Sequence, residues 1–228
     1  MKRKMDVLLE IFQTTFVGFS KAAWQTIQLT FWSLLLGIGI GIIFAFFKIS
    51  KYKVLHIIAD IYITFIRGTP LIVQIFIIYF GLAQMNIVTL EDFTAGVLAL
   101  AIHAGAYIAE IFRGSIQSID KGQMEAAQSL GMTYPLAMRR IILPQAFRRS
   151  IPALGNQFII GLKDSSLVAF IGGKELWATA MTTAADNFRQ FETFFINGLY
   201  YLVLVIIFTY LLKILEKKLD VEQRGEAT

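Results

Sequence analysis

Five apolar stretches follow one another along the chain, separated by short polar or charged segments. Most approach the length of about 20 mostly apolar residues that a membrane-spanning helix needs. Gly68-Thr69-Pro70 interrupts the second stretch, and we expect a helix break there because proline lacks an N–H and disfavours helix at the residue before it. The expected spans cover residues 27–47, 70–83, 93–112, 151–171 and 194–215, with a short interfacial helix over 54–66.

Two further patterns concern the start of the chain. Residues 5–23 carry apolar side chains at three- and four-residue spacing with charges elsewhere, which is typical of an amphipathic helix lying on the membrane surface. A longer, tilted first span is the alternative interpretation. Within the first span, Gly37 and Gly41 have the four-residue spacing that favours close packing of one helix against another.

The amino-acid composition indicates that these apolar helices belong to a membrane protein. Of the 228 residues, 56% are hydrophobic and 16% charged, and the mean hydropathy is +0.63. Ordinary soluble proteins carry about 25% charged residues. Because a compact soluble domain could not bury this much apolar surface, we predict an all-α integral membrane protein with one membrane domain over residues 1–228.

The net charge and the counts of Cys and His narrow the range of functions that the chain could have. The chain has no Cys, which excludes disulfides and thiolate sites, and its two His argue against a multi-histidine metal site. We interpret the net charge of +5 through the positive-inside rule rather than as a nucleic-acid surface. Lys and Arg concentrate in residues 48–53, in residues 113–149 and after Leu212, which places these segments in the cytoplasm, with the N-terminus outside and the C-terminus inside. The basic Lys2-Arg3-Lys4 argues the other way, but the three segments outweigh it.

Residues 113–149 form an unusually long loop between two expected spans, and a loop of this length more often carries function. One short helix is expected over 123–130, ended by a glycine, and a second is expected to begin at Thr133–Pro135 and to stop near Pro144. Two such helices would make a compact knob outside the membrane. The residues that would shape this knob are Glu125, Ala126, Ala127, Gly131, Arg139, Arg140 and Pro144.

The loop resembles the EAA loop of ABC importer permeases. The resemblance rests on Glu125-Ala126-Ala127, three residues, Gly131, nine residues, and then Ile141-x-Leu143-Pro144. Two other stretches resemble the polar amino acid branch of that family: Phe65-Ile66-Arg67-Gly68-Thr69-Pro70 and Ala106-Tyr107-x-Ala109-Glu110-x-x-Arg113-Gly114.

The resemblance implies a type I importer permease fold in a prokaryotic cell membrane. It also implies a second permease chain, identical or similar, and an extracytoplasmic binding protein that delivers a polar amino acid. The knob would dock as a coupling helix on a cytoplasmic ATPase subunit, which would bind ATP and magnesium.

No catalytic signature is found in the chain itself. The phosphate-binding pattern G-x-x-x-x-G-K-[ST] is absent, since Gly172-Gly173-Lys174 is followed by Glu175, and H-E-x-x-H and G-x-S-x-G are absent as well. We therefore expect a permease subunit that is not an enzyme and holds no cofactor. A gradient-driven carrier or passive channel is the main alternative, and a membrane enzyme is a more remote one.

Ionisable residues inside the expected spans are candidate substrate contacts, because a charge inside the bilayer costs at least about 2.5–3.5 kcal/mol. A zwitterionic amino acid needs an anion for its ammonium and a cation for its carboxylate. Glu110 and Asp164 would serve the first purpose and Lys163 the second. His103 and Tyr107 share a helical face with Glu110.

Structural roles compete with these assignments. Glu110 would pair with Arg113 three residues later, an interpretation we favour slightly, and Lys163 would pair with a carboxylate elsewhere. For Asp164 and Lys163 both interpretations stay open. Two carboxylates against one lysine favour a cationic or neutral polar substrate of the arginine, lysine, histidine or glutamine class.

Overall fold

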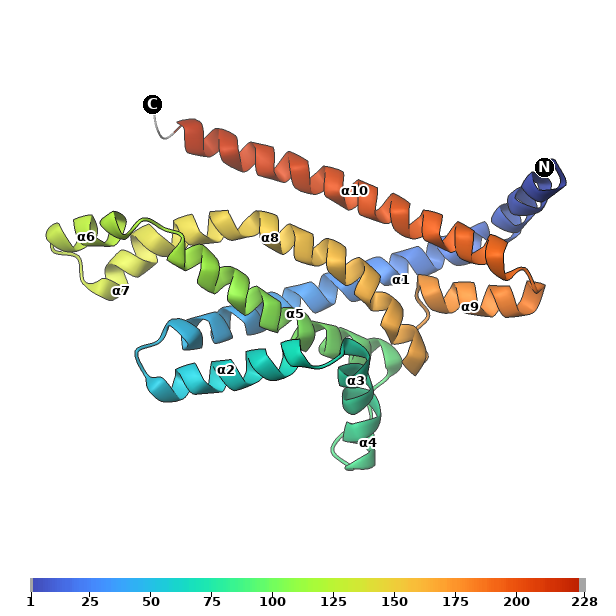
Figure 1. Ribbon diagram of the computed structural model, residues 1–228, viewed down its shortest axis with the longest axis horizontal. Coiled ribbons are helices and arrows are strands. Elements are labelled where there is room, and N and C mark those ends of the chain that lie inside the picture. The colour runs from blue at the N-terminus through green and yellow to red at the C-terminus, as the bar shows by residue number, and fades with distance from the viewer. Residues whose placement is uncertain (1, 226–228) are drawn as a thin grey trace.

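Every element of the described chain is a helix. The computed structural model describes residues 2–225 and the side chains of residues 6–218, so the side chains of Lys2-Arg3-Lys4 lie outside the described part. Figure 1 shows α1, α5, α8 and α10 along the long axis of the molecule, while α3 and α4 turn away from it. In chain order the elements are α1 (Lys2–Ile49), α2 (Lys53–Gly68), α3 (Leu71–Phe76), the π-turn η1 (Ile77–Gly81), α4 (Leu82–Gln84), α5 (Asp92–Gln117), α6 (Lys121–Ser129), α7 (Tyr134–Ala137), the π-turn η2 (Met138–Ile142), α8 (Leu143–Asp164), the 3-10 helix η3 (Ser165–Ile171), α9 (Leu176–Asn187) and α10 (Gln190–Gly225).

The first helix is one continuous element of 48 residues, so the prediction of a separate surface helix over 5–23 is wrong. Part of the apolar face of its first half packs against protein: Phe19 is fully buried and stacks on Tyr200 of α10 with ring centroids 5.3 Å apart, whereas Leu9, Phe12 and Phe16 are exposed. At about 1.5 Å per residue, α1 is roughly 72 Å long, more than twice the thickness of about 30 Å of a hydrocarbon core. The longer first helix, our alternative, describes this segment better.

The break predicted at Gly68-Thr69-Pro70 is confirmed. α2 ends at Gly68, α3 begins at Leu71, and the two helices are bent by 109°. In an uninterrupted helix the carbonyl of Ile66 would accept from residue 70, which is a proline without an N–H. Figure 1 shows α2 running back beside the second half of α1, so this helix belongs to the bundle and is not the separate interfacial helix that we expected.

Glycines let the long helices approach closely. A Cβ added at Gly37 would lie 3.1 Å from the Ala101 carbonyl oxygen, and one at Gly41 would lie 2.5 Å from Ile108 Cγ2. The predicted packing role of this glycine pair is therefore confirmed, and the partner helix is α5. A Cβ at Gly155 of α8 would overlap the side chain of Leu212 in α10.

Within the part of the chain that the structure describes, three helices are long and apolar enough to cross a membrane, namely Asp6–Ile49, Asp92–Gln117 and Gln190–Lys218. The pair Lys53–Gly68 and Leu71–Gln84 passes the same test as one bent span. The expected span over 151–171 is divided, since α8 ends at Asp164 and continues as the 3-10 helix η3. An all-helical membrane protein is thus confirmed, with three or four spans by length and apolarity.

A buried carboxylate organises the segment between η3 and α10. Glu175 is 0% exposed, accepts the N–H groups of Trp177 (2.8 Å) and Ala178 (2.7 Å) at the start of α9, and accepts the Tyr201 hydroxyl at 2.8 Å. Burial raises the pKa of this carboxyl above its ordinary value of 4.5. The turn into α10 passes through Phe188, which has a left-handed φ of 53° and is 89% exposed.

Candidate functional site

A small helical knob, formed by α6 and α7, lies between α5 and α8 (Figure 1). α6 covers Lys121–Ser129, close to the expected helix over 123–130. Asp120 caps its start through a side-chain hydrogen bond of 2.6 Å to a backbone N–H. At its end the N–H of Met132 donates to the carbonyl of Ala127 at 3.1 Å across Gly131, whose φ is +82°. Gly131 therefore ends the helix as predicted, because a left-handed residue at this position favours glycine.

The predicted coupling residues divide into buried and exposed ones. Ala127 is 4% exposed and packs inside the knob, so it does not belong to the docking edge as we expected. The helix does not stop near Pro144 either: α7, η2 and α8 follow one another directly, and Pro144 lies in the first turn of α8 after a widened π-turn. The exposed members are Glu125, Ala126, Gly131, Arg139, Arg140 and Pro144.

The loop is also shorter than predicted over 113–149. Arg113 lies inside α5 and Arg149 inside α8, so the segment outside these long helices runs from residue 118 to residue 142. Arg149 donates to the carbonyl of Ser118 at 2.6 Å and so joins the first turn of the segment to α8. The knob is therefore tied to the helices on both sides.

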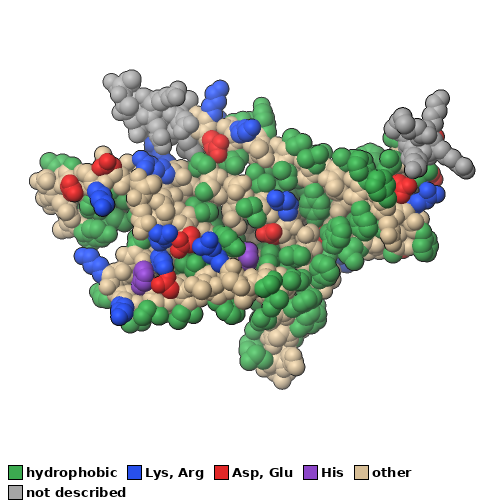
Figure 2. Space-filling view, in the orientation of Figure 1, with side chains coloured by type: hydrophobic (Ala, Val, Ile, Leu, Met, Phe, Trp, Pro, Cys, Tyr) green, Lys and Arg blue, Asp and Glu red, His purple; other side chains and the backbone are tan. Residues whose placement is uncertain are grey.

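A row of polar side chains follows one face of α5. His103, Tyr107, Glu110 and Arg113 are spaced by three or four residues and are all partly exposed. The guanidinium of Arg67, at the end of α2, lies 5.3 Å from the centre of the Tyr107 ring. Figure 2 shows acidic, basic and histidine side chains gathered in this region. Charges within a spanning helix generally face a water-filled path or another protein segment, so this face is the candidate path for a polar solute.

Glu110 is engaged by its own helix. Its Oε2 accepts from Arg113 Nη2 at 2.6 Å and from Nε at 3.0 Å. The same guanidinium donates to Gln117 at 2.6 Å. The pairing that we favoured for Glu110 is confirmed, and its role as a substrate contact stays a prediction.

A small cavity with several polar residues in its wall brings other predicted residues together. It measures about 20 Å³, close to the space that one water molecule needs. α1, α5 and α8 all contribute to its wall, and the side chains of Asp164 and His103 both line it. The complete lining is Thr30, Ser33, Leu34, Leu100, His103, Ala104, Gln157, Gly161 and Asp164.

The two neighbouring charges at the end of α8 have different surroundings. Asp164 is partly buried, and no residue in the described part of the chain donates a hydrogen bond to it or forms a salt bridge with it. Lys163 is exposed and does not line the cavity. The structure therefore does not bring Lys163 to the same cavity as Asp164 and His103, as a shared pocket for both ends of an amino acid would require.

Sequence reasoning missed four polar residues near this cavity. Thr30, Ser33 and Gln157 line it, and Gln74 Oε1 accepts from His103 Nδ1 at 3.0 Å. The available signal was a single amide within an otherwise apolar run, since a buried polar side chain there needs hydrogen-bond partners.

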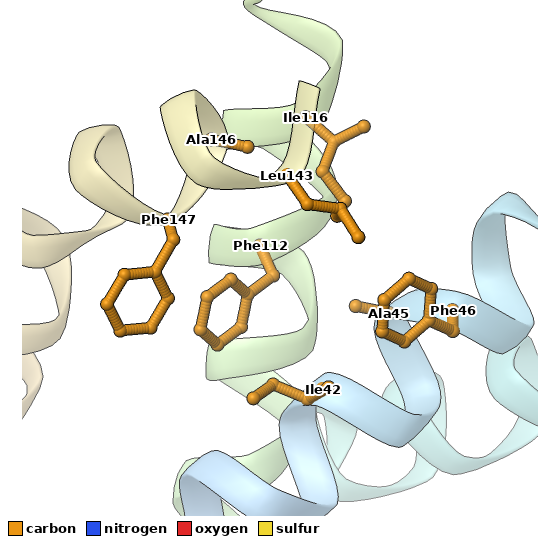
Figure 3. Close-up of a pocket in the computed structure, with 8 residues that line it drawn as sticks. All are labelled: Ile42, Ala45, Phe46, Phe112, Ile116, Leu143, Ala146 and Phe147. Atoms are coloured by element: carbon orange, nitrogen blue, oxygen red, sulfur yellow. The ribbon is translucent and has the colours of Figure 1, made fainter. Parts of the chain in front are cut away.

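A larger cavity of about 200 Å³ lies between α1, α5 and α8, near the knob (Figure 3). Only apolar side chains line it, so it offers nothing to a charged amino acid. Its lining residues are Ile42, Ala45, Phe46, Phe112, Ile116, Leu143, Ala146 and Phe147. Between these two cavities, the one beside Asp164 is the better candidate for contact with a polar solute, because polar side chains contribute to its wall.

Comparison with known proteins identifies the family. The family described as the binding-protein-dependent transport system inner membrane component matches this chain over residues 37–221. The chain belongs to this family. The resemblance inferred from the loop around Glu125 is therefore confirmed.

Individual relatives match this inner-membrane component over most of their length. It is 40% identical over 194 residues to the arginine transport system permease protein ArtQ of Bacillus subtilis (strain 168), covering 85% of this chain and 89% of that protein. It is 38% identical over 199 residues to the glutamine transport system permease protein GlnP of Escherichia coli (strain K12), covering 85% and 91%. A solved structure of an amino acid ABC transporter with histidines is 42% identical, with a TM-score of 0.87, and covers 92% of this chain and 98% of the solved chain.

Proposed function

We propose that this inner-membrane component is the permease subunit of an ATP-driven ABC importer that carries a polar amino acid into the cytoplasm. The observation that supports it most directly is the exposed knob with Glu125 and Ala126 on α6, whose second helix, α7, continues through η2 into the helix that ends at Asp164. A nucleotide-driven movement of the knob would reach Asp164 through α8. The relatives named for arginine and glutamine transport support the same assignment.

The proposed topology has five crossings: α1, the bent pair formed by α2 with α3 and α4, α5, α8 and α10. In Figure 1 these passes alternate in direction, and the two termini lie toward opposite ends of the long axis. The segments rich in Lys and Arg, at residues 48–53 and in the knob, lie at the same end. The positive-inside rule then puts the N-terminus outside and the C-terminus in the cytoplasm.

The proposed partners follow from the chemistry that the chain lacks. A cytoplasmic ATPase would bind ATP and magnesium and receive the knob, with no cofactor held by this chain. A second permease chain would cover the polar face of α5, and an extracytoplasmic binding protein would deliver the amino acid. The bilayer of a prokaryotic cell membrane surrounds the assembly.

The first experiment tests coupling through the knob. ATP-dependent uptake of labelled amino acids would be measured in proteoliposomes that contain the permease, the ATPase and the binding protein. Glu125→Lys should abolish uptake because it reverses the charge on the docking edge, whereas Gln123→Lys, an exposed change in the same helix, should preserve most of it. Uptake that persists without ATP would refute the importer and favour a carrier or channel.

The second experiment tests Asp164 as a contact for a cationic group. Asp164→Asn should lower uptake of arginine about tenfold or more, since a hydrogen bond to a charged group contributes about 1.5–3 kcal/mol. Asp186→Asn, an exposed change in α9, is the matched control. Unchanged arginine kinetics in the Asp164 variant would remove this residue from the site.

A further inference from the structure

The bend between α2 and α3 leaves backbone carbonyls without helical partners, and one side chain serves them. Gln74 is 4% exposed, and its Nε2 lies 2.8 Å from the Ile66 carbonyl oxygen, the group that Pro70 cannot reach with an N–H. The same nitrogen lies 3.1 Å from the Thr69 carbonyl oxygen and 2.9 Å from Thr69 Oγ1. The side-chain amide thus replaces the hydrogen bond that the proline removes.

These contacts also determine which way the amide faces. A carbonyl oxygen only accepts hydrogen bonds, so the NH₂ of Gln74 must point toward Ile66 and Thr69. Its Oε1 therefore points toward His103 Nδ1, 3.0 Å away. Because Oε1 can only accept, Nδ1 must carry the proton, and in the neutral ring Nε2 is left as an acceptor.

This tautomer matters because the His103 ring lines the small cavity with Asp164. No residue in the described part of the chain donates a hydrogen bond to His103 Nε2 or to the Asp164 carboxylate. Both side chains line a cavity with room for about one water molecule, and acceptors at such a cavity suit a small donor-rich group such as an ammonium.

We propose that Gln74 is a positioning residue that braces the α2–α3 bend and holds His103 as its Nδ1–H tautomer, so that the cavity beside Asp164 selects an ammonium group. The selectivity rests on the proposed function, because it concerns the amino acid that the importer would carry. The assignment of the tautomer does not rest on the proposed function, since it follows from the hydrogen-bond partners of Gln74 alone.

Nitrogen NMR tests the tautomer directly. The chain has two histidines, so ¹⁵N-imidazole labelling of this chain alone, in the assembled transporter and with His56→Gln, leaves one labelled ring. We expect a protonated Nδ1 and an unprotonated Nε2. Adding Gln74→Met should abolish this preference, whereas Gln74→Glu should keep it, because a buried protonated Glu donates its O–H to a backbone carbonyl and leaves its other oxygen to accept from Nδ1. A ring protonated at Nε2 in the parent would overturn the proposal.

Direct binding of labelled arginine to the permease–ATPase complex, without the binding protein, tests the selectivity. Gln74→Met should weaken binding about tenfold and Gln74→Glu by less than about twofold, as expected for one misdirected hydrogen bond. If both variants weakened arginine binding equally and lost thermal stability in parallel, Gln74 would only stabilise the bend and would not act through the His103 tautomer. Failure of the parent to bind arginine would overturn the selectivity, even where ATP-driven uptake of another amino acid upheld the proposed function.

Discussion

Replacing Gly41 by alanine would test whether close contact between α1 and α5 holds the bundle together. The added Cβ would lie 2.5 Å from Ile108 Cγ2, 2.7 Å from Ile108 Cβ and 3.1 Å from the backbone nitrogen of Ala109. Ile108 is fully buried, and a β-branched side chain in a helix has one strongly preferred rotamer, so it cannot turn away. The two helices must therefore move apart.

Overpacking of this kind costs about 1–3 kcal/mol, which corresponds to a loss of about 2–12 °C in Tm for a chain of this size. Gly39→Ala is the matched control, since Gly39 is exposed and its Cβ would meet nothing within 4 Å. The control should keep or slightly raise the Tm, because alanine favours helix more than glycine does. Thermal unfolding can be followed through tryptophan fluorescence of the purified transporter in lipid nanodiscs. Equal Tm values for the two variants would refute the packing argument.

Three further predictions concern helix ends and a buried acid. Gly131→Ala should lower the Tm, because an alanine in the left-handed conformation costs about 1–2 kcal/mol. Gly114→Ala is the control and should not lower it. An unchanged Tm in both variants would show that the end of α6 tolerates an ordinary residue. Because the folded-state pKa of Glu175 is raised, folding favours its protonated form, so stability should fall as the pH rises above about 4.5. The Tm of Glu175→Gln should depend less on pH, and an identical pH profile would contradict this. Phe188→Gly should raise the Tm by relieving the positive φ, and a lower Tm would instead show that the exposed ring stabilises the turn.

The features that could be predicted from sequence depend on local chemistry. Pro70 lacks an N–H wherever it stands, so the break of the second apolar stretch follows from the sequence alone. Gly131 similarly marks a helix end because a left-handed position favours glycine. The ion pair of Glu110 with Arg113 could be predicted for the same reason, since residues three apart on a helix are neighbours.

The features that were missed depend on what faces each element in space. The pattern of residues 5–23 is the same whether the apolar face meets lipid or, as here around Phe19 and Ala22, packs against α9 and α10. The burial of Ala127 and the separation of Lys163 from the cavity likewise depend on neighbouring helices. Gln74 and His103 are 29 residues apart in the chain, and no periodicity relates them.

The contact at Gly155 lies close to the middle of α8, which has 22 residues and a length of roughly 33 Å at about 1.5 Å per residue. Because the Leu212 side chain occupies the place of a Cβ there, this point is where α8 and α10 come close together. If α8, which contains Pro152 three residues before Gly155, moves as one body, it turns about this contact. If α8 tilts by about 10° over its length of roughly 33 Å, its two ends shift by about 6 Å relative to each other, and they move in opposite directions. Gly155 would then be the pivot point, so that movement of the knob toward the bundle would carry Asp164 away from the bundle.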